Sequence, residues 1–193
     1  ANMSHEIRTP MNGILGYGEL ICDQAIPLED RMRYGEIIRE SGEHLLTILN
    51  DILDISKIES GRMEISPKPF SPADLACDVV EFLRTEAEAK GLILGIECIG
   101  EIPREIESDP IRVRQILLNL VGNAVKFTDA GQITLSLEVV PGGAAAQVRL
   151  DVTDTGVGIA PEAQPGLFER FIQVYSSVSR THGGTGLVLA ICK

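Results

Sequence analysis

The stretch that decides the fold is Ile65-Ser66-Pro67-Lys68-Pro69-Phe70-Ser71-Pro72, because its three prolines cannot continue a helix. Before it the hydrophobic pattern is helical throughout, and after it helical and alternating patterns follow one another. We therefore predict an all-α helical hairpin over residues 1–64, a proline-rich linker over residues 65–72 and a second domain over residues 73–193.

Two mainly apolar series precede the linker, with steps of three and four residues that are typical of helices packed along a seam. The first series is Ile7, Met11, Ile14, Gly18 and Ile21, and the second, after a break at residues 25–27, is Tyr34, Ile38, Ser41, Leu45, Ile48, Ile52 and Ile55. A second apolar row widens the later stripe, namely Leu46, Leu49, Leu53 and Ile58. Because two helices bury too little, we expect the hairpin to dimerise into a four-helix bundle. The alternative is that the rest of the chain covers this row.

The region after the linker mixes helices with strands. Ser71-Pro72 predicts the start of a helix that reaches about residue 90, and Asp109-Pro110 the start of another that reaches about residue 127. Residues 92–99 are expected to form a strand, and residues 132–140 and 147–153 an antiparallel hairpin. This order predicts an α+β sandwich with its helices on one face of the sheet.

Composition excludes several classes of protein. The 193 residues are 44% hydrophobic, which is enough for a core, and their net charge of −11 argues against nucleic-acid binding. No apolar run approaches the roughly 20 residues that span a bilayer, and no signal peptide opens the chain. The scattered cysteines Cys22, Cys77, Cys98 and Cys192 are typical of a reducing compartment. We therefore expect a cytoplasmic segment without membrane contact, whose parent protein is either anchored or free.

His5 lies about 200° around the helix from Ile7, so its imidazole is expected to face solvent. Thr9 is one turn further on the same face, Glu6 is its neighbour, and Pro10 is expected to bend the helix. A neutral imidazole beside a carboxylate can act as a nucleophile near pH ~7, with the carboxylate as general base. From geometry alone, a surface role for His5 is the commoner alternative.

In the predicted helix after Asp109, the side chains of Asn119, Asn123 and Lys126 share one polar face. Two carboxamides and an ammonium group suit a phosphate–metal assembly, since an amide oxygen can coordinate Mg²⁺. An ordinary solvated face is the alternative for this pattern.

Asp154 has the same strand parity as the apolar residues Leu150 and Val152, so its carboxylate should point with them and needs a donor such as the exocyclic amine of adenine. A glycine cluster over residues 183–186 precedes the apolar residues 187–191, an arrangement typical of an anion site.

Taken in order, these motifs resemble those of sensor histidine kinases. Ser4-His5-Glu6-Ile7-Arg8-Thr9-Pro10 resembles the H-box, and Asn119-Leu120-Val121-Gly122-Asn123-Ala124-Val125-Lys126-Phe127 the N-box. The segment Asp154-Thr155-Gly156-Val157-Gly158 resembles the G1 box. The F-box is similar to Leu167-Phe168-Glu169-Arg170-Phe171, and the G2 box to Gly184-Thr185-Gly186-Leu187. The resemblance covers nearly the whole chain and implies that residues 73–193 are a catalytic domain with the Bergerat ATP-binding fold, C-terminally incomplete by the family's pattern.

The resemblance also implies roles for residues. It makes His5 the phosphoacceptor, Glu6 its proton acceptor, and Thr9 the residue that positions water during dephosphorylation of a response regulator. In the ATP site it implies Asn123 on Mg²⁺, Asn119 and Lys126 near the phosphates, Asp154 on adenine, and residues 160–183 as a mobile lid. The other residues that it implies in this site are Phe127, Gly156, Gly158, Ile159, Phe168, Gly184, Thr185, Gly186 and Leu187.

The implied function is two-component signalling by a bacterial protein-histidine kinase that uses ATP and Mg²⁺. A homodimer joined through the hairpin would phosphorylate His5 and pass the phosphoryl group to an aspartate of a receiver domain, fused as in a hybrid kinase or separate. Phosphatase activity is a further option.

One departure from the family weakens this reading. Val188 occupies the position of the third G2 glycine, which predicts weaker ATP binding or a disordered lid unless the side chain simply packs into the sheet. The alternatives are a dimeric scaffold with a degenerate ATP site that docks a response regulator, and a Bergerat-fold ATPase without phosphotransfer.

Overall fold

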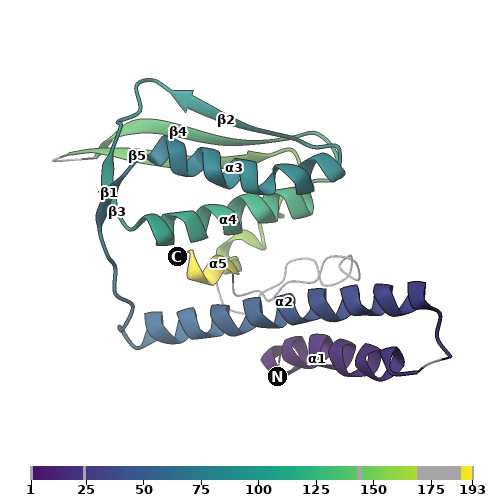
Figure 1. Ribbon diagram of the computed structural model, residues 1–193. Helices are drawn as coiled ribbons and strands as arrows, with labels where there is room; N and C mark the ends of the chain where they lie inside the picture. Colours follow the sequence, from purple (N-terminus) through teal and green to yellow (C-terminus); the bar gives the residue numbers. More distant parts are fainter. Residues whose placement is uncertain (1, 24, 143–144, 169–187, 193) are drawn as a thin grey trace. The chain divides into compact units, whose positions relative to one another are not determined.

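The computed structural model describes residues 2–23, 25–142, 145–168 and 188–192 (Figure 1). The chain divides into two compact units, the first built mainly on Ala1–Met63 and the second on Glu64–Pro165. Most of the predicted lid and several motif residues lie outside the described residues, namely Glu169, Arg170, Phe171, Gly184, Thr185, Gly186 and Leu187.

The first unit is an antiparallel helical hairpin of α1 (Asn2–Ile21) and α2 (Leu28–Glu59) (Figure 1). The rings of Tyr17 and Tyr34 meet with their centroids 5.2 Å apart. A Cβ at Gly13 would lie 3.1 Å from the Ser41 hydroxyl, so the missing side chain allows the helices to approach closely. Ile48 is 1% exposed and the other predicted seam residues are half-buried, except Met11, which is 44% exposed. The predicted seam is therefore confirmed apart from Met11.

The widened apolar row of α2 stays uncovered in the single chain. Its members Leu46, Leu49, Leu53 and Ile58 are 42–62% exposed. On α1, Met11, Leu15 and Leu20 are exposed as well. Such a row of large apolar side chains is available to pack against another surface.

The second unit contains two helices and two small sheets. Its elements are β1 (Lys68–Phe70), α3 (Pro72–Ala89), β2 (Ile93–Ile99), β3 (Ile106–Ser108), α4 (Pro110–Phe127), β4 (Gln132–Gly142) and β5 (Ala145–Asp154). A 3₁₀ turn at Gln164–Gly166 and α5 (Val188–Ile191) follow in the sequence, and α5 is grouped with the first unit. The main sheet has the order β2-β4-β5, with β2 parallel and β5 antiparallel to β4, while β1 and β3 form an antiparallel pair.

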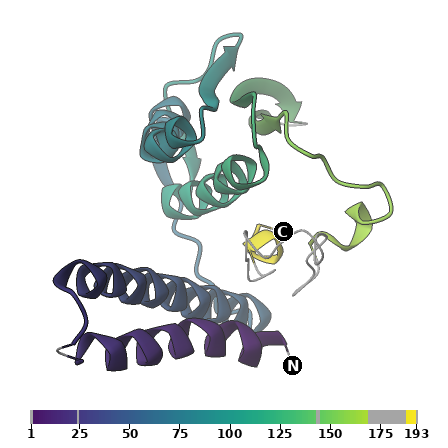
Figure 2. The same cartoon turned by 90° about the vertical axis from the view of Figure 1, so that its right-hand side faces the viewer.

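Helices α3 and α4 cover one face of the main sheet (Figures 1 and 2). The core between them consists mainly of aliphatic side chains that are 0–7% exposed, including Val79, Leu83, Leu117, Val121, Ile133, Leu135 and Leu137. The predicted fold class, a helical hairpin followed by an α+β domain, is thus confirmed.

Both helices of the second unit begin as their sequence predicts. The Ser71 hydroxyl accepts a hydrogen bond from Asp74 N (3.1 Å). The Asp109 carboxylate accepts from Ile111 N and Arg112 N at 3.0 and 3.2 Å, and each cap is followed by a proline in the first turn.

The segment expected to be a simple linker carries a strand that the sequence did not predict. β1 pairs through Pro69↔Glu107, and Ser66 N donates to Asp109 Oδ2 at 3.0 Å. The chain is therefore attached to the second unit from Ser66 onward. Of the helices in the described part of the chain, none is both long enough and apolar enough to cross a bilayer.

Candidate functional site

The phosphoacceptor candidates lie on α1, and the side chains of His5 and Thr9 are exposed as predicted. The Thr9 hydroxyl donates to the His5 carbonyl at 3.1 Å, which fixes it one turn along the same face. Pro10 is buried inside the helix and offers no N–H to the carbonyl of Glu6. The helix nevertheless continues through Pro10 from Asn2 to Ile21, so the imidazole of His5 is presented on its first turn.

On α4 the polar face has the predicted composition. Asn119, Asn123 and Lys126 are all half-buried, and the opposite side of the helix packs into the core. The Asn119 amide donates to Cys192 Sγ at 3.8 Å, and Lys126 Nζ lies 5.2 Å from the centroid of the Phe127 ring. Two carboxamides and one ammonium group are therefore held on one side of a helix whose other side is fixed.

The end of α4 is supported by a lysine that sequence reasoning missed. Lys90 Nζ donates to the carbonyls of Val125 and Lys126 at 2.8 and 3.1 Å. Carbonyls in the last turn of a helix generally lack a partner within it, and a positive charge at this end interacts favourably with the helix dipole. Lys90 thus fixes the turn of α4 that carries Lys126. The only sequence signal was a cation directly before Gly91, where the preceding helix ends.

Asp154 closes β5 opposite Ile133, on the strand face predicted for it. Its side chain is exposed because the sheet ends at this point, and Gly156 N donates to its Oδ1 at 2.8 Å. One carboxylate oxygen is therefore held by the backbone, while a carboxylate can accept several more hydrogen bonds.

The backbone packs unusually closely beside this carboxylate. A Cβ at Gly156 would lie 2.6 Å from the Phe127 carbonyl and 2.9 Å from both Asp154 Oδ1 and the Thr128 hydroxyl. Any larger residue would force the loop outward, so glycine is required here for close approach and not for its dihedral freedom. The adjacent Gly158 has φ of +67°, a value that glycine adopts without strain.

Two other predicted site residues, Ile159 and Phe168, are 43% and 46% exposed. Exposed apolar side chains of this kind are suited to contact a flat base.

The pKa of a carboxylate is lowered at the start of α4. Hydrogen bonding from Ser66 N, and then from the amides of Arg112 and Ile111, holds the pKa of Asp109 below its ordinary value of 3.8. Asp109 is buried, with 6% of its surface exposed. Its carboxylate both caps the helix that carries the N-box residues and accepts the hydrogen bond from Ser66 N.

Comparison with known families agrees with this geometry. Residues 1–61 match the model of the His Kinase A (phospho-acceptor) domain, and residues 108–193 match that of the histidine kinase-, DNA gyrase B-, and HSP90-like ATPase. The chain therefore belongs to the histidine kinases, as a phosphoacceptor domain followed by an ATPase domain.

Individual relatives match nearly the whole chain. The non-motile and phage-resistance protein of Caulobacter vibrioides is 46% identical over 100% of this chain and 23% of its own length. The autoinducer 2 sensor kinase/phosphatase LuxQ of Vibrio parahaemolyticus is 44% identical, again over 100% of this chain and 23% of its own. A crystal structure of full-length ShkA in complex with AMPPNP is 39% identical, has a TM-score of 0.74, and matches 98% of this chain and 38% of that one.

This chain thus has the make-up of a histidine kinase catalytic core, with a phosphoacceptor domain followed by an ATPase domain. It spans less than a quarter of the length of the two curated relatives named above.

Proposed function

We propose that this core binds ATP with Mg²⁺ at the polar face of α4 and the Asp154–Gly156 loop, and transfers the γ-phosphoryl group to His5. The observation that carries the proposal is the row of Asn119, Asn123 and Lys126, which are half-buried on one face of α4. The structural match to ShkA, which was solved in complex with AMPPNP, supports nucleotide binding by this chain.

The residues present fit a magnesium ion that is shared with a nucleotide. Among the described residues no cluster of three or more His, Cys, Asp or Glu side chains could hold a metal. Mg²⁺ in such sites keeps several waters and takes one or two protein oxygens together with phosphate oxygens. The amide oxygen of Asn123 is the protein ligand we assign, and the ion when bound would neutralise phosphate charge.

The proposed adenine contact is the Asp154 carboxylate. It is exposed at the end of β5, and its Oδ1 is oriented by Gly156 N. The adenine exocyclic amine is a donor, so it would complement an acceptor-only carboxylate. Ile159 and Phe168 would supply apolar contact, and Asn119 and Lys126 the polar contact to the phosphates.

In the transfer step a neutral His5 ring nitrogen attacks the γ-phosphorus. A nitrogen–phosphorus bond forms, the bond to the bridging oxygen breaks, ADP leaves, and the ring proton passes to Glu6. His5 is exposed and therefore accessible to a bound nucleotide, provided that the hairpin and the ATP-binding domain meet. The phosphohistidine would then donate to an aspartate of a receiver domain, fused or separate.

The proposal extends to assembly and to the reverse activity. The exposed row of Leu46, Leu49 and Leu53 supports a homodimer through the hairpins. The kinase/phosphatase designation of LuxQ, together with an exposed Thr9 one turn from His5, supports a phosphatase role. Because ATP is supplied in the cytoplasm, we place this core there.

A labelling experiment tests the proposal. The chain is incubated with γ-labelled ATP and Mg²⁺, and acid-labile, alkali-stable label is expected on the wild type but not on His5→Ala. The matched control is His44→Ala, which removes an exposed histidine of α2 and should leave labelling intact. Binding of ATP by His5→Ala, measured by calorimetry, should be unchanged. Label that persists in His5→Ala would refute the assignment, and a wild type that binds no ATP would favour the scaffold alternative.

A further inference from the structure

Thr128 carries a buried hydroxyl that the proposed function does not yet use. It directly follows α4, is 0% exposed, and donates its backbone N–H to the Ala124 carbonyl at 3.1 Å. Its Oγ1 has no hydrogen-bond partner among the described residues. A buried hydroxyl without a partner is destabilising, so its position in the fold calls for a reason.

The reason lies in what surrounds this hydroxyl. Thr128 Oγ1 and Asp154 Oδ1 both lie 2.9 Å from the position of a Cβ on Gly156, so the two oxygens flank the same glycine. Asp154 is acceptor-only when ionised, and Gly156 N is the one donor to it in the described part of the chain. The hydroxyl has a proton to donate, and the carboxylate has lone pairs free to accept it.

A neighbouring carbonyl is the competing acceptor. The Phe127 carbonyl lies 2.6 Å from the same point, but it belongs to the peptide that precedes Thr128. A side chain reaches the carbonyl of its own preceding peptide only with a strongly bent hydrogen bond, which is weak. The Asp154 carboxylate comes from a different strand and carries charge, so it is the stronger acceptor.

We propose that Thr128 is a positioning residue for adenine specificity, whose hydroxyl donates to the Asp154 carboxylate in the nucleotide-bound enzyme. This inference rests on the proposed function, in which Asp154 accepts from the exocyclic amine of adenine. With Gly156 N on one side and Thr128 on the other, the carboxylate is fixed in the orientation that meets the amine. Without the hydroxyl it is held by Gly156 N alone and rotates.

The test compares two nucleotides in matched variants. Thr128→Val keeps the branched shape and removes the hydroxyl, while Thr128→Ser keeps the hydroxyl. Dissociation constants are measured by calorimetry for ATP and for purine riboside triphosphate, which lacks the exocyclic amine. We expect Thr128→Val to weaken ATP binding roughly tenfold and to leave the analogue unchanged, with Thr128→Ser close to wild type. Thr153→Val, an exposed change on the other face of β5, should not alter the ratio.

The outcomes separate this inference from a structural role and from failure of the proposed function. Equal weakening of both nucleotides, or no change in either, overturns it, since a merely structural threonine would not change the ratio between them. A wild type that binds neither nucleotide overturns the proposed function and this inference together. If Thr128→Val does not fold, Thr128→Ala provides the same ratio, because each variant is its own control across the two nucleotides.

Discussion

In the ATP-binding domain, Leu135 and Leu137 of β4 are 0% exposed, whereas in the hairpin Leu46 and Leu53 of α2 are 62% and 56% exposed. The ATP-binding domain closes its core with its own sheet and helices. The hairpin buries one seam and leaves a second apolar row outside. The hairpin therefore presents a row of apolar side chains that another surface can cover.

The first prediction tests whether the uncovered apolar row makes the contact between hairpins, by making this row polar. In the double variant Leu46→Lys/Leu53→Lys we expect the dimer to dissociate, with a dissociation constant raised roughly a thousandfold, because each change counts twice in a symmetric interface. Sedimentation velocity measures the assembly, and circular dichroism checks that the helices remain.

The matched control for this variant is Thr47→Lys. It adds one lysine, half the charge of the double variant, at an exposed site about 100° around the helix from Leu46. This control should remain dimeric. A double variant that stays dimeric would show that the rest of the chain, and not a second hairpin, covers the row.

The second prediction acts on the other region. Gly156→Ala places a Cβ 2.6 Å from the Phe127 carbonyl, so the loop at Asp154 must shift. We expect ATP affinity to fall roughly a hundredfold, in line with the usual cost of overpacking a close contact. Calorimetry measures the affinity, and the dimer should persist because the hairpin is untouched.

Gly122→Ala provides the comparison for Gly156→Ala. A Cβ there meets nothing within 4 Å, and the residue is inside α4. This change should raise the free energy of unfolding by about 0.4–1 kcal/mol, through reduced freedom of the unfolded chain. Equal ATP affinity for Gly156→Ala and the wild type would mean that the loop does not form the site.

These two regions also differ in how far their sequence predicts them. The seam of the hairpin and the starts of α3 and α4 at Ser71 and Asp109 follow from local patterns, and the structure confirms them. The strand β1 was not predicted because its prolines indicated a linker, although an edge strand tolerates proline. Its partner, β3, lies more than thirty residues away, and no local signal specifies such a pairing.

The candidate site shows the same division. The shared face of Asn119, Asn123 and Lys126 follows from helical spacing alone, and the structure has these residues on one side of α4. Lys90 and Thr128 could not be found in this way. Their relevance depends on which carbonyl or carboxylate the folded chain brings next to them, and that is decided by tertiary packing.

A third prediction concerns acid. Because hydrogen bonds lower the pKa of Asp109 in the folded state, its contribution to stability is complete above the ordinary value of 3.8 and is lost as pH falls toward the folded value. The thermal unfolding midpoint of the ATP-binding domain should therefore decrease as the pH is lowered below about 4. Asp109→Asn should lower this midpoint at neutral pH and make it depend less on pH.

Ser71→Ala is the control for this pH effect. It removes the cap of α3, which cannot titrate, and should lower stability by about 1 kcal/mol at every pH. If the unfolding midpoint of Asp109→Asn depends on pH as strongly as that of the wild type, Asp109 is not the cause of the acid sensitivity.

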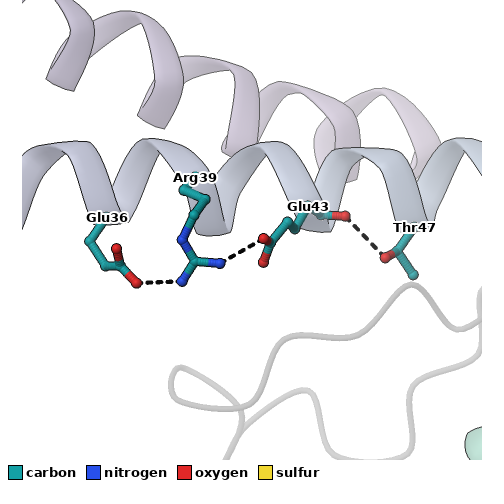
Figure 3. Close-up of polar contacts among 4 residues, drawn as sticks. All are labelled: Glu36, Arg39, Glu43 and Thr47. Atoms are coloured by element: carbon teal, nitrogen blue, oxygen red, sulfur yellow. Dashed lines mark hydrogen bonds and ion pairs between the residues drawn. The ribbon is translucent and has the colours of Figure 1, made fainter.

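The smallest effect is expected at the ion pairs on the outer face of α2. Arg39 bridges Glu36 and Glu43, and the Thr47 hydroxyl donates to the Glu43 carbonyl (Figure 3). The Arg39 side chain is 54% exposed, so water and salt screen both pairs. Arg39→Met should leave the dimer dissociation constant and the unfolding midpoint within error of the wild type, at low and at high salt. A clear loss of dimer at low salt with Arg39→Met, absent with Arg39→Lys, would mean that the ion pairs, which lie on the same face of α2 as Leu46 and Leu53, contribute to the contact between hairpins.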